Sequence, residues 1–359
     1  MQRSKSIDTF AKCLRIVSGI TFMLAFGAGL SPAGAQQRVT ADEWRVYTDK
    51  FVEAEGRVVD NANKNITHSE SQGYGLLLAY LAGQPADFAR IWDFTRKELF
   101  VRDDGLAAWR WEPDKSPHIS DFNNATDGDI LIAYALARAG QDWGETDYMK
   151  AAAKITAGIL AKTVVRHAGR TILLPGVDGF TAESRSDGPV VNPSYLIFEA
   201  FPVLAQLVPS PMWDGLKNDG LDLLRRAQFG PAKLPSEWVS LGGAPRPAKG
   251  FDAVFSYNAV RIPLYLVRAG LTEPSLLERV ETGMADEAGE PSVIDLNSGK
   301  PLEPLADAGY RIIVDAIGCA VRGRPVRQAN TRFEPTFYYP ATLQLLTLAH
   351  LREAHPECL

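Results

Sequence analysis

The feature that most limits the fold of this chain is helical patterning along almost its whole length. Apolar residues recur at intervals of three and four within segments rich in Ala and Leu, which is typical of helices. We predict about eleven helices and one short strand, at 171–175. The helices are expected at 40–59, 70–81, 86–100, 127–139, 147–165, 192–207, 211–229, 256–269, 275–288, 307–322 and 340–353.

Four long loops separate some of these helices, at 100–124, 174–193, 230–255 and 323–336. All four contain aromatic and charged residues, and loops of this length in a compact domain usually serve a function. The sequence shows no 34-residue period of the kind that marks helical repeat proteins. We therefore predict an all-α fold in which paired helices form a closed ring, with the long loops gathered at one end.

Residues 1–35 have the pattern of a secretory signal peptide. Basic residues precede an apolar run at 16–30, and the small residues of Ser31–Ala35 follow it, as at a signal-peptidase site. The apolar run is too short and too rich in Gly for a membrane span. We place the cleavage after Ala35 and expect residues 36–359 to be a single exported domain, periplasmic or secreted, without a membrane span.

The net charge of the mature chain limits its possible binding partners, and its cysteine content limits its possible disulfides. Removing the four bases and one acid of residues 1–35 changes the net charge from −5 to −8. This negative charge argues against nucleic acid or an anionic membrane surface as a partner. Only Cys319 and Cys358 remain after cleavage, and the sequence does not determine whether they pair.

The strongest candidate for a functional segment is 123–129, Asn-Asn-Ala-Thr-Asp-Gly-Asp, which leads into an apolar helix that Gly140 is expected to end. Thr126 or Asp127 can cap this helix by accepting a hydrogen bond from a free backbone N–H group. Capping of the helix accounts for one of the two acids in this segment but not readily for both. An apolar helix that holds Asp127 and Asp129 at its start is also typical of the wall of a site, and the segment alone does not decide between these explanations.

A second helix start of this kind contains Glu70, in the segment 68–75, His-Ser-Glu-Ser-Gln-Gly-Tyr-Gly. Two glycines at a helix start cost about 1 kcal/mol each relative to Ala, so another part of the chain should approach the backbone closely there. Apolar surroundings that include Tyr74 would raise the pKa of Glu70, as a general acid requires. The simpler alternative is that Glu70 only interacts with the helix dipole.

A third polar helix start is 255–261, Phe-Ser-Tyr-Asn-Ala-Val-Arg, where Arg261 lies one turn after Tyr257 on the same face. A surface Arg beside a core Tyr is the simpler explanation, but three similar helix starts favour a site. Aromatic side chains in the loops either plug the core or bind sugar rings; they are Trp109, Trp111, Phe180, Tyr195, Trp238, Tyr338 and Tyr339.

Other chemistries have little support in the sequence. It contains no HExxH, GxSxG or P-loop motif and no Cys/His spacing of a metal site, and its five His residues are scattered. We therefore expect neither a metal nor a cofactor. Carboxylates that act without a cofactor indicate cleavage of glycosidic bonds.

These segments resemble the motifs of glycoside hydrolase family eight. Residues 125–129 and the apolar positions up to Trp143 resemble the diagnostic motif, and 69–75 resembles the general-acid segment. The order and spacing of the motifs agree over nearly the whole mature chain. The resemblance implies an (α/α)6 barrel and an inverting endo-glycosidase that acts mostly on β-1,4-glucan. The layout is most similar to exported cellulases of bacterial cellulose synthesis, which implies a functional association with the cellulose synthase machinery.

The resemblance also implies roles for single residues. Glu70 would be the proton donor, Asp127 would hold and distort the sugar at the cleavage point, and Trp109 would stack on a sugar ring. The remaining positions that would contact substrate are Tyr74, Tyr195, Tyr257, Asn258 and Arg261.

The chain departs from the family pattern at Asn258, where many members carry an Asp that serves as general base. A neutral amide cannot take a proton from water as a carboxylate does. Asp127, or another acid such as Asp129 or Asp252, would have to activate the water, or else the enzyme is impaired.

We therefore expect an inverting endo-β-1,4-glucanase that hydrolyses cellulose-like chains. The alternatives are a xylanase or chitosanase on the same scaffold, and a weakly active or non-catalytic glucan-binding accessory of cellulose synthesis. Inversion is expected because Glu70 and Asp127 start two different helices. Neighbouring helix axes lie about 8–10 Å apart, which would leave room for a water molecule between the two carboxyls.

Overall fold

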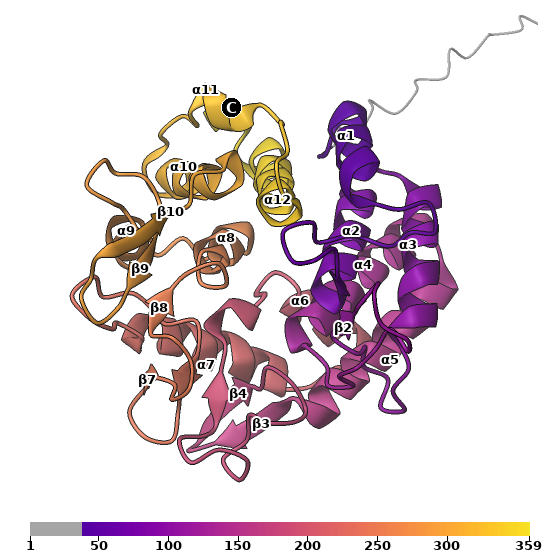
Figure 1. Ribbon diagram of the computed structural model, residues 1–359, viewed down its shortest axis with the longest axis horizontal. Coiled ribbons are helices and arrows are strands. Elements are labelled where there is room, and N and C mark those ends of the chain that lie inside the picture. The colour runs from indigo at the N-terminus through magenta and orange to yellow at the C-terminus, as the bar shows by residue number, and fades with distance from the viewer. Residues whose placement is uncertain (1–37) are drawn as a thin grey trace, which may run out of the picture. The chain divides into compact units, whose positions relative to one another are not determined.

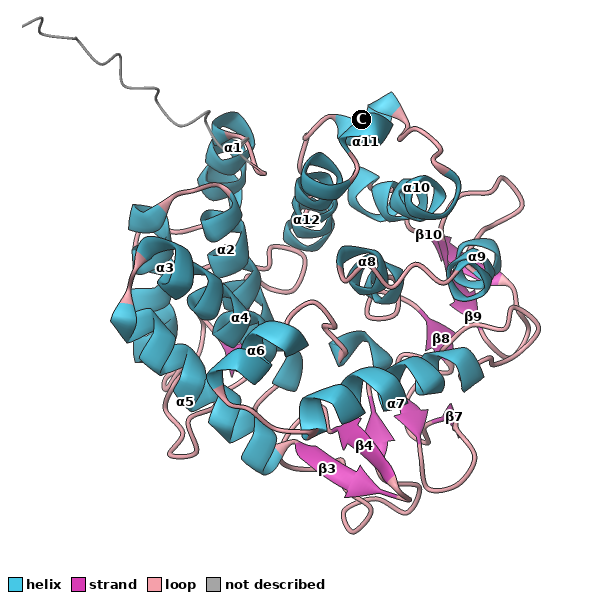
Figure 2. Ribbon diagram, turned by 180° about the vertical axis from the view of Figure 1, so that it is seen from behind, coloured by secondary structure: helices cyan, strands magenta, loops and turns pink. Residues whose placement is uncertain are grey.

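Helices follow one another along the chain, with short strands between them, in the computed structural model, which describes residues 38–359 (Figures 1 and 2). The predicted signal peptide lies outside the described residues. The helices are α1 (Ala41–Phe51), α2 (Ser69–Leu81), α3 (Pro85–Glu98), α4 (Thr126–Trp143), α5 (Thr146–Lys162), α6 (Phe201–Leu207), α7 (Met212–Arg226), α8 (Arg261–Arg268), α9 (Pro274–Gly283), α10 (Ala308–Arg322), α11 (Gln328–Thr331) and α12 (Tyr338–Ala354).

The even-numbered helices form the inner layer of a ring. α2, α4 and α12 are buried over most of their length, whereas α1, α3 and α7 bury one face only, as amphipathic outer helices do. α2 packs on α4, α4 on α6, α8 on α10 and α10 on α12. The 3-10 turn Pro193–Tyr195 before α6 contacts α8, and α12 contacts α2, which closes the ring. Figure 1 shows α2, α8 and α12 toward the middle, with α3, α5 and α9 outside them. The predicted all-α fold is thus confirmed, and the ring matches an (α/α)6 barrel.

Short antiparallel strands accompany the helices. β3 (Val164–His167) and β4 (Arg170–Leu173) form a hairpin, so the single predicted strand has a partner that the sequence pattern assigned to a helix. β8 (Val254–Phe255), β9 (Ser292–Asp295) and β10 (Pro301–Pro304) form a small sheet that was not predicted. The remaining strands are β1 (Thr67–His68) with β2 (Arg110–Trp111), and β5 (Val190–Val191) with β6 (Val239–Ser240) and β7 (Arg246–Pro247).

Several predicted helix boundaries are wrong, and proline explains two of them. Proline lacks an N–H donor and is tolerated only in the first turn of a helix. Pro202 therefore places the start of α6 at Phe201, after a separate 3-10 turn at Pro193–Tyr195, instead of at 192. Pro263 likewise places the start of α8 at Arg261 instead of 256.

Two further boundaries depend on glycine. α1 ends at Phe51 rather than 59, because the chain turns back through Gly56, whose φ is +95° and where a Cβ would lie 2.2 Å from the carbonyl oxygen of Arg90. α4 continues past Gly140 to Trp143 and ends with Gly144 in the left-handed conformation. Gly140 instead lets α5 approach, since a Cβ there would lie 2.8 Å from Met149.

The C-terminal segment is joined covalently to the inner layer. Cys319 of α10 forms a disulfide with Cys358 in the final 3-10 turn, Pro356–Cys358. The pairing that the sequence left open is therefore present. No helix within residues 38–359 is long and apolar enough to cross a membrane.

Candidate active site

Two glycines bring the starts of α2 and α4 into direct contact. A Cβ at Gly73 would lie 2.6 Å from the Cβ of Leu131, and one at Gly128 would lie 2.1 Å from Ser69 Oγ and 2.7 Å from the backbone nitrogen of Glu70. Only glycine fits at such distances. The close approach that the sequence predicted near Gly73 is therefore the contact with α4, and it places Glu70 and Asp127 next to each other.

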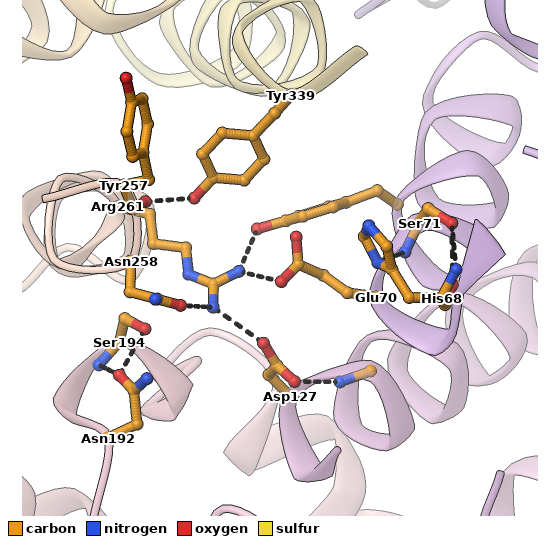
Figure 3. Close-up of polar contacts among 12 residues, drawn as sticks. His68, Glu70, Ser71, Asp127, Asn192, Ser194, Tyr257, Asn258, Arg261 and Tyr339 are labelled. Carbon is orange, nitrogen blue, oxygen red and sulfur yellow. Dashed lines mark hydrogen bonds and ion pairs between the residues drawn. The ribbon is translucent and has the colours of Figure 1, made fainter. Parts of the chain in front are cut away.

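A buried arginine joins the two carboxylates (Figure 3). Arg261, the first residue of α8, is 1% exposed. Its Nη1 donates to Glu70 Oε2 at 2.6 Å, and its Nη2 donates to Asp127 Oδ2 at 2.8 Å. Nη2 also donates to Asn258 Oδ1 at 3.2 Å, and the guanidinium lies over the ring of Tyr195. Three helix starts thus converge on one guanidinium, whose planar donors suit two carboxylates at once.

The carboxyls of Glu70 and Asp127 titrate as a pair. Burial and, to a smaller extent, the neighbouring Glu70 together raise the pKa of Asp127 to about 7, against the opposing effect of Arg261. Burial also raises the pKa of Glu70, but the charges of Arg261 and His68 outweigh burial and hold that pKa below its ordinary value. The two carboxyls therefore titrate together, and within the pair the neutral form is favoured at Asp127 and the ionised form at Glu70. The predicted rise in the pKa of Glu70 is wrong for this arrangement, because the local segment does not reveal Arg261.

This cluster lies in a cleft of about 730 Å³, a size typical of ligand sites. The cleft is lined from several elements distant in sequence: the segment before α2, the 100–124 loop, the 3-10 turn before α6, the segment before α8, and the start of α12. Of the four long loops that were expected to gather at one end, only 100–124 contributes to this lining, through Trp109. The lining contains four carboxylates and several aromatic side chains, among them Glu70, Asp127, Trp109 and Tyr257.

The described residues offer one group of Cys, His and acidic side chains close enough to hold a metal ion, Cys319, Glu357 and Cys358. Its two cysteines are joined in the disulfide and are not available as thiolate ligands. The cleft carboxylates face Arg261 and each other, an arrangement suited to proton transfer and to binding sugar hydroxyl groups.

Comparison with known proteins places this arrangement in a family. The model of the family described as glycosyl hydrolases family 8 matches residues 20–350. The chain belongs to glycosyl hydrolases family 8. It is therefore a glycoside hydrolase, and the carboxylate pair lies in the cleft of an enzyme of that class.

Relatives support this assignment in sequence and in structure. A probable endoglucanase of Novacetimonas hansenii is 33% identical over 336 residues, covering 92% of this chain and 95% of the relative. An endoglucanase of Cellulomonas uda is 41% identical over 225 residues, 62% of each chain. The crystal structure of a family 8 endoglucanase from Klebsiella pneumoniae aligns with a TM-score of 0.78 and 33% identity, covering 87% of this chain and 99% of that one.

The two acids of the 123–129 segment have separate places. Asp127 lines the cleft, and its Oδ1 accepts from the N–H of Gly128 at 2.8 Å, so it both serves the helix start and faces the site. Asp129 is fully buried and accepts from the Ala107 N–H and from Asn124 Nδ2, both at 2.8 Å, so it anchors the 100–124 loop. Thr126 does not cap α4; its hydroxyl donates to the carbonyl of Leu174.

The predicted substrate-binding residues divide into two layers. Trp109, Tyr195, Tyr257 and Asn258 line the cleft, whereas Arg261 is buried beneath it. Trp109 is held in place by the hydrogen bond that its Nε1 donates to Asp121 at 2.8 Å.

Tyr74 is also fully buried, with its hydroxyl paired with that of Tyr265 and 3.4 Å from Arg261 Nη1. It acts on the guanidinium and does not line the cleft. Of the other loop aromatics, Tyr339 lines the cleft, whereas Tyr338 is buried.

Phe180, Trp238 and Phe251 stack on one another, and Trp111 stacks on His118. The rings of these two groups are therefore covered at least partly by neighbouring side chains. The sequence could not show which rings are covered and which are free to bind a ligand, because the stacking contacts depend on how the loops fold.

Several cleft residues were not among the predicted site residues. Asp60 and His68, 3.3 Å apart, line the cleft beside Glu70, and Asp307, Tyr310 and Phe337 contribute from the start of α10 and the segment before α12. His68 belonged to a segment of interest, but its pairing with Asp60 depends on a turn that the predicted first helix ran through. The others carry no local motif.

The predicted spacing of the two carboxyls also needs correction. The 8–10 Å separation of ordinary helix axes does not apply where Gly73 and Gly128 let α2 and α4 touch. Glu70 and Asp127 bind adjacent nitrogens of one guanidinium, on the same side of the cleft. The spacing argument for a water molecule between these two carboxyls is therefore wrong.

Proposed function

We propose that this chain is an inverting endo-β-1,4-glucanase that hydrolyses cellulose-like chains, with Glu70 as proton donor. The observation that carries the proposal is the Glu70–Arg261–Asp127 cluster in the floor of a cleft with aromatic side chains in its walls. The names of the relatives support the substrate class, since the Acetobacter xylinum structure, 32% identical, is that of an endo-β-1,4-glucanase.

Substrate binding would prepare Glu70 for its role. Sugar hydroxyl groups that donate to Asp127 stabilise its ionised form and lower its pKa, while the sugar displaces water from Glu70 and raises the pKa of that carboxyl. The proton of the pair then moves from Asp127 to Glu70. Glu70 donates it to the glycosidic oxygen, and the ionised Asp127 with Arg261 holds the sugar at the cleavage point.

Aromatic side chains would bind the chain on both sides of this point. Trp109 offers a partly exposed ring, and Tyr257, 43% exposed, offers another from the segment before α8. Such rings present flat apolar faces to sugar rings while their polar atoms remain hydrogen-bonded. An open cleft of this kind suits internal cleavage of a long chain.

The proposal is tested by a reducing-end assay on soluble cellulose, with xylan and chitosan as alternative substrates. Glu70→Gln keeps the shape of the side chain but has no proton to give, so we expect a loss of activity of about 10²–10⁴-fold or more with binding of cello-oligosaccharides retained. Glu273→Gln, at an exposed carboxylate paired with Arg225, is the matched control.

Near-normal activity of Glu70→Gln would remove Glu70 from the mechanism. If the natural protein binds glucan without hydrolysing it, the non-catalytic accessory is favoured instead. Asn258 is the reason for this alternative, because its amide stands where many family members carry the base. A preference for xylan or chitosan would show that the protein is a xylanase or a chitosanase on the same scaffold.

We further propose that the protein is exported after cleavage behind Ala35 and acts in the periplasm or outside the cell. The Cys319–Cys358 disulfide supports an oxidising compartment. A functional association with cellulose synthase rests on the family resemblance alone. N-terminal sequencing of the exported protein should begin at Gln36, and a cytoplasmic protein that keeps Met1 would contradict export.

A further inference from the structure

An inverting hydrolase needs a base across the cleft from its acid, and none of the acids considered from the sequence suits this task. Asp127 shares a guanidinium and a proton with Glu70 on the acid's own side. Asp129 is buried against the 100–124 loop, and Asp252 is exposed and does not line the cleft. Asn258 lines the cleft at the position where many family members carry an Asp.

One carboxylate contacts Asn258 from behind. Glu237 is half-buried, and its Oε1 accepts from the backbone N–H of Asn258 at 2.7 Å. Its own N–H donates to the carbonyl of Val254 at 3.2 Å, which fixes residue 237 against β8. Burial raises the pKa of Glu237, opposed by hydrogen bonds from Asn258 and the Ala259 N–H and by the charge of Arg261. Arg261 is the charged group that acts on Glu237. The other groups that hydrogen-bond to Glu237, at Asn258 and Ala259, are uncharged.

The orientation of the Asn258 amide follows from its neighbours. Arg261 has only donors, so the atom facing its Nη2 at 3.2 Å is the amide oxygen. The amide nitrogen is then left for an acceptor, and Glu237, whose Oε1 accepts from the backbone N–H of Asn258 at 2.7 Å, is the carboxylate in contact with this residue. The amide oxygen has a second lone pair with which it can accept from a water molecule in the cleft.

We propose that Glu237, acting through Asn258, takes the place of the carboxylate that many family members carry at position 258. The inference rests on the proposed inverting hydrolysis and deepens it. Glu237 is a positioning residue and final proton acceptor, because Asn258, and not Glu237, faces the substrate.

The proton transfers balance in a single displacement. The water oxygen bonds to the anomeric carbon as the bond to the leaving oxygen breaks, and Glu70 gives its proton to that oxygen. The water proton passes to Asn258 Oδ1 while Asn258 Nδ2 gives a proton to Glu237. Three steps then complete the cycle. The amide of Asn258 returns to its ordinary form, Glu237 loses its proton to solvent, and Glu70 is protonated again.

Glu237→Gln tests this role while keeping the fold, because the Gln oxygen can still accept from the Asn258 N–H. We expect kcat on soluble cellulose to fall by about 10²-fold or more, with KM changed less than about threefold. Glu273→Gln should leave both unchanged. Asn258→Asp introduced into Glu237→Gln should recover at least about tenfold of the lost kcat, because the carboxylate then faces the water directly.

The pH profile supplies a readout that a purely structural role would not move. The acidic limb of kcat should reflect Glu237, whose raised pKa means that the base form is lost as pH falls through a value above that of an ordinary Glu. In Asn258→Asp alone the new carboxylate faces the water directly and becomes the base in contact with the Arg261 guanidinium, whose charge should move this limb to lower pH.

Two results would overturn the inference: kcat of Glu237→Gln within about threefold of the natural enzyme, or an acidic limb that Asn258→Asp leaves in place. If Glu237→Gln fails to fold, as judged by its melting temperature and cello-oligosaccharide affinity, the single Asn258→Asp profile still decides. Failure of the proposed function is distinct, because the natural protein would then be inactive in the same assay.

Discussion

Gly128→Ala tests whether contact between α2 and α4 brings Glu70 and Asp127 together. An Ala Cβ there would lie 2.1 Å from Ser69 Oγ and 2.7 Å from the Glu70 nitrogen, well inside any tolerated contact. Ala is favoured over Gly in a helix by about 1 kcal/mol, whereas overpacking costs about 1–3 kcal/mol, so the net loss of stability should be about 0–2 kcal/mol. The two helices must separate by several tenths of an ångström or more to accept the methyl group.

That movement should affect catalysis far more than stability. Displacing Glu70 from Asp127 and Arg261 by about 1 Å is enough to cost about 10²-fold in rate. We therefore expect kcat on soluble cellulose to fall by about 10²-fold while the melting temperature falls by only a few degrees. Gly220→Ala is the control, because the three atoms nearest to a Cβ there are side-chain carbons of Leu196 and Phe198 at 3.0 Å or more.

A second variant identifies the obstacle. Ser69→Ala removes the hydroxyl but leaves the Glu70 backbone nitrogen 2.7 Å from the new methyl group, so it should not rescue Gly128→Ala. Full activity of Gly128→Ala, or recovery of activity in the double variant, would refute the argument that backbone contact sets the geometry of the pair.

Two further predictions concern the cleft wall and the buried loop anchor. Trp109→Ala should weaken cello-oligosaccharide binding, measured by calorimetry, by about 1–3 kcal/mol if sugar stacking resembles base stacking, with little change in melting temperature; strong destabilisation with affinity retained would show that Trp109 is a core residue. Burial raises the pKa of Asp129 to about 7, so the folded state binds its proton more tightly than the unfolded state does, and this group's contribution to stability declines as pH rises between about 4 and 7. Urea unfolding should show Asp129→Asn to be less pH-dependent over this range, by up to about 1.4 kcal/mol per pH unit, and an unchanged slope would contradict the assignment.

Much of the fold was predictable because helical patterning is local. The segments around Glu70 and Asp127 were recognisable for the same reason. A helix start that combines glycines with acids is unusual, and a few consecutive residues are enough to show it. The boundaries at Pro202 and Pro263 were also readable from the sequence, since proline restricts a helix wherever it stands. The β9–β10 hairpin was not, because its strands are short and show little apolar alternation.

The electrostatics of the site could not be predicted from local sequence. Arg261 lies 191 residues from Glu70, and its charge reverses the expected direction of the Glu70 pKa shift. Glu237 lies in a loop without any motif, 21 residues before Asn258, and only the folded chain shows their contact. Residues that act through a partner leave no pattern of their own in a single sequence.

The stereochemistry of hydrolysis tests the central claim most directly. Proton NMR of a cello-oligosaccharide digest should be recorded within minutes, before mutarotation mixes the anomers. A single displacement by water, with Glu70 as acid and the base across the cleft, predicts that the α-anomer appears first from the β-linked chain. If the β-anomer appears first, a covalent intermediate forms, and both the inverting mechanism and the role of Glu237 are wrong.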